Sequence, residues 1–196
     1  LTRQCIGTDG LKFDTIQEAV NVAQAGDTIL IRDGIYTEES ITIANNGQVG
    51  SPITISGYGS EKPILQNFPE PWDGNGNKAI FLLNRDGQGN YIFKQLIMRN
   101  SGFGFHFFSP TLRVHDIKIE NIEMYNHLAG IRINPDSPGV ERLYVLNSIV
   151  HDTRGDQGGF DFKVNRLDYR AGKGSRDIII RNTKTYNNIH QQASGF

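Results

Sequence analysis

Four segments in the second half of the chain repeat one pattern, and this repeat decides the fold. They are Gln95-Leu-Ile-Met-Arg-Asn100, Asn121-Ile-Glu-Met-Tyr-Asn126, Asn147-Ser-Ile-Val-His-Asp152 and Asn182-Thr-Lys-Thr-Tyr-Asn187. Their spacings are 26, 26 and 35 residues. A repeat this short cannot bury a core of its own, so successive repeats must stack on one another. The pattern therefore predicts a solenoid.

Each segment is preceded by a β-rich run and followed by a turn and a strand that begins with glycine. The preceding runs are Tyr91-Ile-Phe93, Ile117-Lys-Ile119, Leu143-Tyr-Val145 and Ile178-Ile-Ile180. The Gly-led strands are Gly104-Phe-His-Phe107, Gly130-Ile-Arg-Ile133, Gly159-Phe-Asp-Phe162 and Gly195-Phe196. Helices between the strands and a leucine-repeat consensus are both missing, so the coil predicts an all-β protein, a parallel β-helix.

Stacking gives a role to the first residue of each repeat. Gln95, Asn121, Asn147 and Asn182 should form one column, in which the amides hydrogen-bond along the stack and satisfy buried backbone groups. We expect this column to belong to the scaffold rather than to a functional site.

The N-terminal part predicts a cap for the first coil. Ile16, Ala19, Val20 and Ala23 follow the helical period, and the sequence offers a capping box at Asp14 and Gln17 or at Thr15 and Glu18. This predicts a helix over Thr15 to Ala25 that covers strand edges which would otherwise be open. We expect one domain, with residues 1–26 as the cap and 27–196 as coils. A new Gly-led strand begins at Gly195, so we also expect further coils, or a stacking partner, beyond this end.

Composition and charge exclude several classes of protein. Hydrophobic residues make up 37% of the chain, and 20 basic against 21 acidic residues give a net charge of −1. This balance gives no reason to expect nucleic acid or a membrane as a partner. The longest apolar run, 79–83, is too short to span a bilayer. Cys5 is the only cysteine, so an intrachain disulfide is impossible. The Pro/Gly/Asn-rich stretch 66–78 predicts a protruding loop with Trp72 at its tip.

The opening of the chain resembles a known superfamily. The residues that carry the resemblance are Thr15-Ile-Gln-Glu-Ala-Val20, Ala25-Gly-Asp-Thr-Ile29, Gly34-Ile-Tyr-Thr-Glu38 and Gly50-Ser-Pro-Ile-Thr-Ile55. They are similar to the start of secreted right-handed parallel β-helix proteins of the pectate-lyase-like superfamily, including chondroitinase B-like and alginate-lyase-like enzymes and family 9 pectate lyases. The resemblance implies a right-handed coil, an extracellular location and a polysaccharide lyase acting on an acidic polysaccharide.

Nearer to the chemistry, the stretch from Gly159 to Lys163 and the final Ser194-Gly195-Phe196 resemble the calcium-binding segments of family 9 pectate lyases. That family places aspartates immediately before each Gly-aromatic pair. This chain has Gly158, Ala193 and Ser194 at those positions, so the family's calcium ligands do not carry over. The family's catalytic lysine lies in a later coil, beyond Phe196.

Strand alternation predicts one outward column on the Gly-led strands. The inward residues should be Phe105, Phe107, Ile131, Ile133, Phe160 and Phe162. The outward residues should be His106, Arg132 and Asp161 in one column, with Phe108, Asn134 and Lys163 beside them. Cations, a carboxylate and an aromatic ring in a row suit an acidic sugar chain that lies across the coils. The alternative is a solvated face in which an Arg132–Asp161 pair contributes under about 1 kcal/mol.

Roles follow from this column and from the turn at 151–157. Arg132 is the candidate clamp for a sugar carboxylate, and Lys163 is the candidate base of a uronate β-elimination. His106, Phe108, Asn134, Arg154 and Asp161 are the candidate substrate-binding residues. Asp152, Asp156 and Asp161 offer the oxygen ligands that Ca²⁺ prefers. The competing functions are a non-catalytic glycan-binding or adhesin β-helix and a structural segment.

Overall fold

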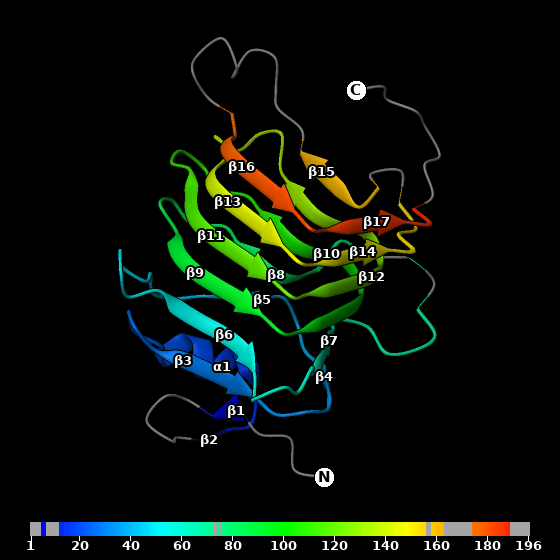
Figure 1. The fold of residues 1–196 in the computed structure, drawn as a ribbon, viewed down its shortest axis with the longest axis horizontal. Coiled ribbons are helices and arrows are strands. Elements are labelled where there is room, and N and C mark those ends of the chain that lie inside the picture. Colours follow the sequence, from blue (N-terminus) through cyan, green and yellow to red (C-terminus); the bar gives the residue numbers. More distant parts are fainter. Residues whose placement is uncertain are drawn as a thin grey trace.

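The chain folds into a parallel coil that rises from the N-terminal end to the C-terminal end (Figure 1). The computed structural model describes residues 5–6, 12–72, 74, 76–155, 158–162 and 174–188. Its elements are β1 (Cys5–Ile6), β2 (Lys12–Phe13), α1 (Ile16–Val22), β3 (Thr28–Ile31), β4 (Ile35–Thr37), β5 (Ile41–Thr42), β6 (Ile53–Gly57), β7 (Ile64–Gln66), β8 (Ala79–Leu83), β9 (Gly89–Lys94), β10 (Ile97–Phe107), β11 (Val114–Glu120), β12 (Glu123–Ile133), β13 (Val140–Leu146), β14 (Ile149–His151), β15 (Phe160–Phe162), β16 (Arg176–Arg181) and β17 (Lys184–Tyr186).

The strands form three faces around one core. The first face holds β3, β6, β9, β11, β13 and β16, and its edge is extended by the antiparallel strands β1 and β2. The second face holds β4, β7, β14, β17 and residues 97–99 and 123–125. The third face holds β5, β8, β15 and residues 103–107 and 129–133. The long strands β10 and β12 thus each contribute to two faces, and the predicted all-β parallel β-helix is confirmed.

Left-handed residues stack in three columns, of which the first lies within the strands of the first face and the other two make bends between the faces. Three columns have φ between 50° and 60°: Asn90, Asp116, Arg142 and Asp177; Gln95, Asn121, Asn147 and Asn182; and Asn100, Asn126, Asp152 and Asn187. Asn and Asp are among the non-glycine residues that adopt this conformation most readily. The polar residues at both ends of each repeat segment therefore mark the corners of the coil.

The predicted column of stacked amides exists, but its environment differs from the prediction. Asn182 Nδ2 donates a hydrogen bond to Asn147 Oδ1 at 3.2 Å, and Asn121, Asn147 and Asn182 are exposed. Their role is to shape a corner at the surface rather than to satisfy buried backbone groups. The buried amide contact lies at the next corner, where Asn126 Nδ2 donates to Asn100 Oδ1.

The capping helix is shorter than predicted. It spans Ile16–Val22, Thr15 is its N-cap, and Thr15 and Glu18 form the expected capping box. Ala23 already has φ −57° and ψ 138°, so the chain leaves the helix three residues before Gly26. Ile16, Ala19 and Val20 are buried against the first coil, as a cap requires.

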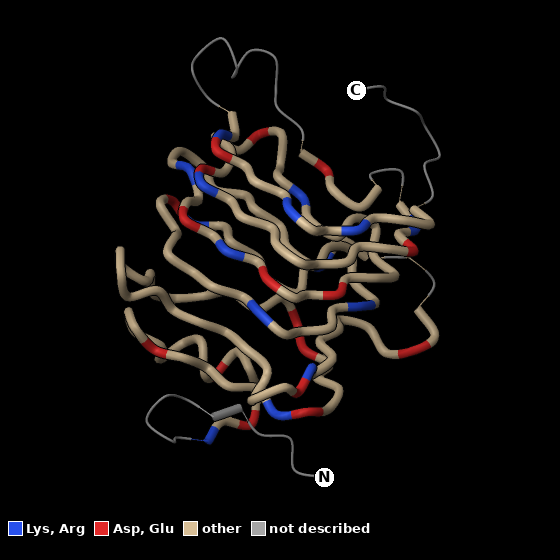
Figure 2. Tube along the Cα trace, viewed as in Figure 1, with Lys and Arg blue, Asp and Glu red and all other residues tan. Residues whose placement is uncertain are grey.

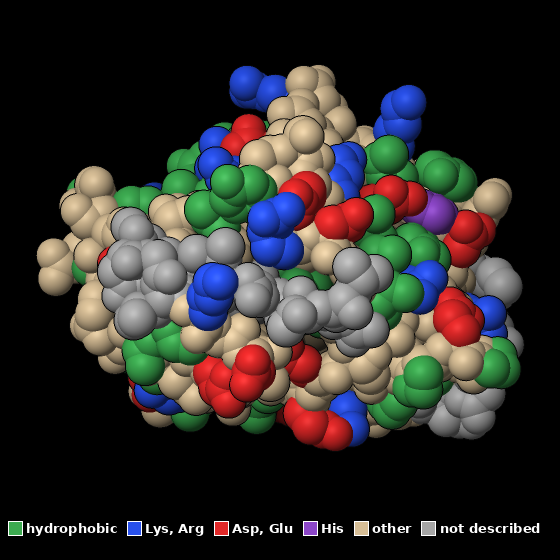
Figure 3. Space-filling view, turned by 90° about the horizontal axis from the view of Figure 1, so that it is seen from below, with side chains coloured by type: hydrophobic (Ala, Val, Ile, Leu, Met, Phe, Trp, Pro, Cys, Tyr) green, Lys and Arg blue, Asp and Glu red, His purple; other side chains and the backbone are tan. Residues whose placement is uncertain are grey.

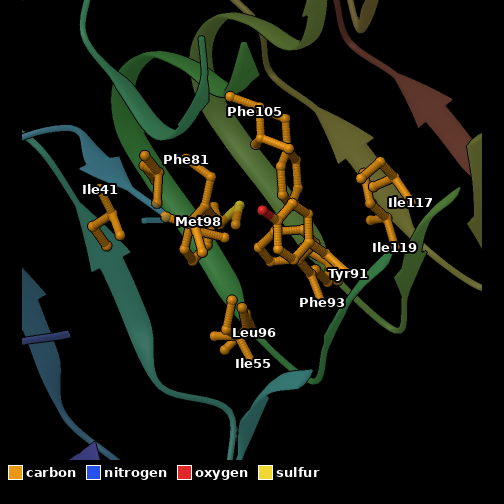
Figure 4. Packing of buried hydrophobic residues seen from close by; sticks show 14 of the residues in the cluster. Ile41, Ile55, Phe81, Tyr91, Phe93, Leu96, Met98, Phe105, Ile117 and Ile119 are labelled. Atoms are coloured by element: carbon orange, nitrogen blue, oxygen red, sulfur yellow. The ribbon is translucent and has the colours of Figure 1, made fainter. Parts of the chain in front are cut away.

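The interior of the coil is filled by side chains that alternate along the strands. Figure 4 shows Phe81, Phe93 and Phe105 gathered with Met98 and Tyr91 in the centre. The rings of Phe93 and Phe105 are 4.9 Å apart, and those of Phe81 and Phe105 are 5.6 Å apart. Phe105, Phe107, Ile131 and Ile133 are buried, and Phe160 and Phe162 pack against the same cluster, so the predicted inward set is confirmed.

The prediction for Trp72 was wrong. Its side chain is only 5% exposed, and its ring stacks on Phe68 at a centroid distance of 5.7 Å. Lys78 Nζ lies 5.2 Å from the centre of the Phe68 ring. Two large apolar rings are more stable packed together than projecting into water, so Trp72 is sheltered by Phe68 of the same loop.

Charged side chains of both signs are interspersed along the coils (Figure 2) and on the face seen from below (Figure 3). This distribution agrees with the net charge of −1. None of the described helices has the length and apolar character needed to cross a membrane.

Candidate functional site

The predicted outward column lies on the third face. His106 pairs in register with Leu82 below it and Arg132 above it, and Arg132 pairs with Asp161. Phe103 lies beneath this column, since its ring is 4.9 Å from the His106 ring and 5.0 Å from Arg132 Cζ. The structure therefore brings His106, Arg132 and Asp161 together, as alternation predicts. We call these three residues and Phe103 the third-face column.

The third-face column is less exposed than the sequence led us to expect. Asp161 is 5% exposed, and the side chain of Arg132 is 21% exposed. Arg132 Nε lies 3.8 Å from Asp161 Oδ2. The solvated-face interpretation is therefore wrong for this pair, because a carboxylate that has lost its water depends on the neighbouring cation. The guanidinium also covers the Phe103 ring, a cation–π arrangement.

His106 is held in its neutral form. Burial lowers the pKa of His106 to about 4, and the neighbouring Arg132 charge lowers it in the same direction. Its Nε2 is buried and has no hydrogen-bond partner among the described residues. The ring stacks beside Phe108, with centroids 6.2 Å apart. A neutral imidazole at this place can donate or accept a hydrogen bond, but it adds no positive charge to the column.

We expect the pH dependence of stability to report this burial. In the unfolded state His106 binds a proton below its ordinary pKa of about 6.5. In the folded state it binds that proton only near pH 4, so between these values only the unfolded state is protonated at His106. The free energy of unfolding should therefore fall as the pH falls through this window, with a contribution from His106 of at most about 1.4 kcal/mol per pH unit. Urea unfolding at pH 7, 6, 5 and 4.5 should show a shallower fall in His106→Asn than in the native sequence. Parallel curves for the two proteins would contradict the burial of a neutral imidazole.

The other predicted substrate-binding residues lie around the column with different exposure. Phe108 is 41% exposed and follows directly after β10. Asn134 Oδ1 accepts a hydrogen bond from the backbone N–H of Asp136 at 2.9 Å, so its side chain shapes the turn after β12. Arg154 is exposed, and its Nη1 donates to the Trp72 backbone oxygen at 3.2 Å. Substrate binding by Asn134 and Arg154 stays a prediction.

Two of the predicted residues lie outside the described residues, namely Lys163 and Asp156. Asp152 is exposed, and its Oδ2 lies 2.6 Å from His151 Nδ1. Within the described parts of the chain, no three His, Cys, Asp or Glu side chains gather as a metal site would require. Asp161 lies against Arg132 and Asp152 against His151, so these two described carboxylates do not by themselves form a calcium site.

Sequence reasoning missed a second column, on the second face. The ring of His151 stacks between Tyr125 at 5.2 Å and Tyr186 at 4.9 Å, and His151 Nε2 lies 3.1 Å from Glu123 Oε1. Arg99 continues the column, with its Nη1 3.4 Å from the Tyr125 hydroxyl. Arg99, Tyr125, His151 and Tyr186 all occupy the fifth position of their repeat segments, and that shared position was the signal in the sequence.

Phe103 was also missed. It has the same parity as Phe105, yet it packs in a separate small cluster with Ala79 and Ala129. Alternation counted from Gly104 therefore does not extend back to Phe103.

Comparisons with known proteins agree with this architecture. The Chondroitinase B family model matches residues 12–65. Pectate lyase L of Paenibacillus polymyxa (strain SC2) is 31% identical over 170 residues, which are 82% of this chain and 36% of that protein. The uncharacterized protein YwoF of Bacillus subtilis (strain 168) is 36% identical over 59 residues, which are 30% of this chain and 12% of that protein.

Two solved structures share the fold. Pectate lyase Pel9A matches with a TM-score of 0.58 and 17% identity, over 86% of this chain and 40% of that one. A rhamnogalacturonan lyase matches with a TM-score of 0.67 and 15% identity, over 92% of this chain and 48% of that one. The chain thus spans less than half the length of each of these relatives. The repeat, the three-faced parallel coil and these likenesses together confirm the predicted resemblance of the chain to pectate-lyase-like parallel β-helix proteins.

Proposed function

We propose that the chain is part of an extracellular polysaccharide lyase that cleaves an acidic polysaccharide by β-elimination. The observation that carries this proposal is the likeness to pectate lyase L, because it extends over 82% of the chain. The third-face column supports the proposal because the Arg132 guanidinium is held in place over the Phe103 ring. Extracellular location belongs to the proposal on the same ground.

Arg132 is the residue that we assign to the substrate carboxylate. Its Nε faces Asp161, so we assign the two Nη atoms to a bidentate contact with a uronate. Neutralising that carboxylate lowers the energy of the carbanion that forms beside it. Asp161 acts through Arg132, as a positioning residue that fixes the guanidinium plane.

The elimination balances with one base and one leaving group. A base removes the proton from the carbon next to the carboxylate, and the electron pair forms a carbon–carbon double bond. The bond from the neighbouring carbon to the glycosidic oxygen breaks, that oxygen takes a proton from water, and the base returns its proton to the solvent. Lys163 stays the proposed base, which requires its amine to be neutral although the ordinary pKa of lysine is about 10.4.

Calcium has no step in this mechanism, since Asp152 and Asp161 do not by themselves form a site for the ion. Asp152, Asp156 and Asp161 as joint ligands remain a proposal that depends on Asp156. Isothermal titration calorimetry with Ca²⁺ on the native chain and on Asp156→Asn tests this proposal. Equal heats of binding from the two proteins would contradict it.

Binding of acidic oligosaccharides tests the role of Arg132. Oligogalacturonate, alginate and dermatan fragments are titrated against the native chain, Arg132→Ala, Arg132→Lys and the control Lys94→Ala, whose cation lies on the first face. A charge-assisted contact contributes about 1.5–3 kcal/mol, so Arg132→Ala should weaken binding by about 10-fold to 100-fold. The affinity of Arg132→Lys should lie between those of Arg132→Ala and the native chain, and the affinity of Lys94→Ala should equal that of the native chain.

Circular dichroism of each variant shows whether the fold is kept. Equally weak binding by the native chain and Arg132→Ala to all three ligands would contradict the assignment. Elimination is followed in the same samples as the ultraviolet absorbance of the conjugated double bond, with and without Ca²⁺. Lys163 can act as the base only when its amine is neutral, and the resemblance places the family's own catalytic lysine beyond Phe196. We therefore expect these 196 residues to bind without forming product. Robust product would contradict this expectation and make Lys163 the first residue to replace.

A further inference from the structure

A hollow of about 300 Å³ lies on the first face, on another side of the coil from the third-face column. Ile92, Lys118 and Tyr144 occupy neighbouring strands in register and lie along its floor. Val49 and Pro52, from the turn between β5 and β6, form one wall. This turn lies at the left edge of the molecule in Figure 1, beside β6 and β9.

The wall is fixed to the coil. Gln48 and Ser51 exchange two backbone hydrogen bonds, of 3.0 and 2.9 Å, which close the turn. The Gly47 N–H donates to the Gly89 oxygen at 3.2 Å, and Asn90 Nδ2 donates to the Gly47 oxygen at 3.4 Å. A Cβ on Gly47 would lie 2.2 Å from the Asn90 oxygen, so only glycine allows this close approach. The hollow is therefore a built feature of the fold.

The charges around the hollow are already balanced. Asp116 accepts two hydrogen bonds of 2.7 Å from Arg142, and this contact holds the pKa of Asp116 down to about 2. Lys118 Nζ lies 2.8 Å from Glu120 Oε2. Because each charge faces an opposite charge, the hollow offers a charged ligand little net attraction. An uncharged ligand that can still form hydrogen bonds suits it better.

Size and surface chemistry narrow the ligand further. Ligand pockets commonly run from about 300 to about 1,000 Å³, so this hollow has room for one ring rather than a long chain. The Tyr144 ring and the Ile92 side chain offer an apolar floor, while Asn90, Asp116 and Lys118 offer polar atoms at the rim. One apolar side and a polar edge are the features of a pyranose ring.

We propose that this hollow binds a neutral pyranose unit, with the apolar side of the sugar against Tyr144 and Ile92. Its hydroxyl groups meet the Asn90 amide and the charged groups of Asp116 and Lys118. Val49, which is 91% exposed at the tip of the wall, borders the same ligand. The proposal is separate from the lyase chemistry, because it assigns to the same coil a second sugar-binding place that prefers uncharged sugars over acidic ones.

Ligand-detected saturation-transfer NMR tests the proposal on the full chain. The probes are the methyl glycosides of galactose, glucose, xylose and rhamnose, with methyl glucuronide as the charged comparison. We expect at least one neutral glycoside to bind with a millimolar dissociation constant, with the strongest transfer at protons of its apolar side. Tyr144→Ala should weaken that binding at least tenfold, whereas Tyr144→Phe should keep most of it.

Two controls separate this site from the third face. Tyr58→Ala removes a tyrosine that is 42% exposed elsewhere on the surface, and it should leave the affinity unchanged. Tyr144→Ala should bind acidic oligosaccharides as the native chain does. Absence of transfer to every neutral glycoside, tighter binding of the glucuronide, or equal binding by Tyr144→Ala would each overturn the proposal, whatever the outcome for Arg132.

Discussion

Replacing Asp161 with alanine is expected to lower the free energy of unfolding by about 3–5 kcal/mol, because it leaves the Arg132 guanidinium partly buried without its carboxylate. Asp161 is 5% exposed, so water cannot substitute fully for the lost carboxylate. Urea unfolding at pH 7, followed by circular dichroism, measures the change.

The controls use the same residue type and the same pair. Asp136→Ala removes an exposed aspartate and should change stability by less than about 0.5 kcal/mol. The double variant Arg132→Met, Asp161→Leu replaces both charges with apolar groups and should recover most of the lost stability. If Asp161→Ala lowers the free energy of unfolding by less than about 1 kcal/mol, the Arg132–Asp161 pair behaves as an exposed ion pair and the prediction is wrong.

The second large effect is expected from Phe105→Ala, at about 3–5 kcal/mol. The Phe105 ring is fully buried and lies within 6.3 Å, centroid to centroid, of the rings of Phe81, Phe93 and Phe107. Removing it opens a cavity that the hydrogen-bonded coils above and below cannot close. Thermal and urea unfolding both measure the loss.

Phe108→Ala is the matched control, since it removes the same side chain three residues further on, where 41% of it is exposed. We expect less than about 1 kcal/mol of lost stability there. Similar losses at both positions would contradict the inward and outward assignment of the two rings.

The sequence predicted the parts of the fold that repeat. Alternation placed Phe105 and Ile131 inside and His106 and Arg132 outside, because strand geometry leaves only two directions for a side chain. The capping box at Thr15 fixed the start of α1, whereas its end at Ala23 depended on how the chain enters β3. The pattern of a single sequence says little about where a helix ends when the end depends on the path into the next strand.

The candidate site was predicted in position but not in environment. Register placed Arg132 beside Asp161, yet exposure depends on segments far apart in the chain, and the column proved largely buried. Trp72 shows the same limit, since composition predicted a loop but not the Phe68 ring against which it packs. The hollow beside Tyr144 needs a turn some 95 residues earlier in the chain, a contact that no local pattern in this sequence indicates.

The corner columns stack in the same way whether a coil contains 26 or 35 residues. Asn126 contacts Asn100 across 26 residues, whereas Asn182 contacts Asn147 across 35. The longer coil nevertheless returns to the same place, because β16 pairs with β13 in the register that β13 keeps with β11. The extra residues thus leave the axial stacking unchanged. Such a scaffold can acquire or lose loops, and hence specificities, one coil at a time without a penalty that spreads to its neighbours.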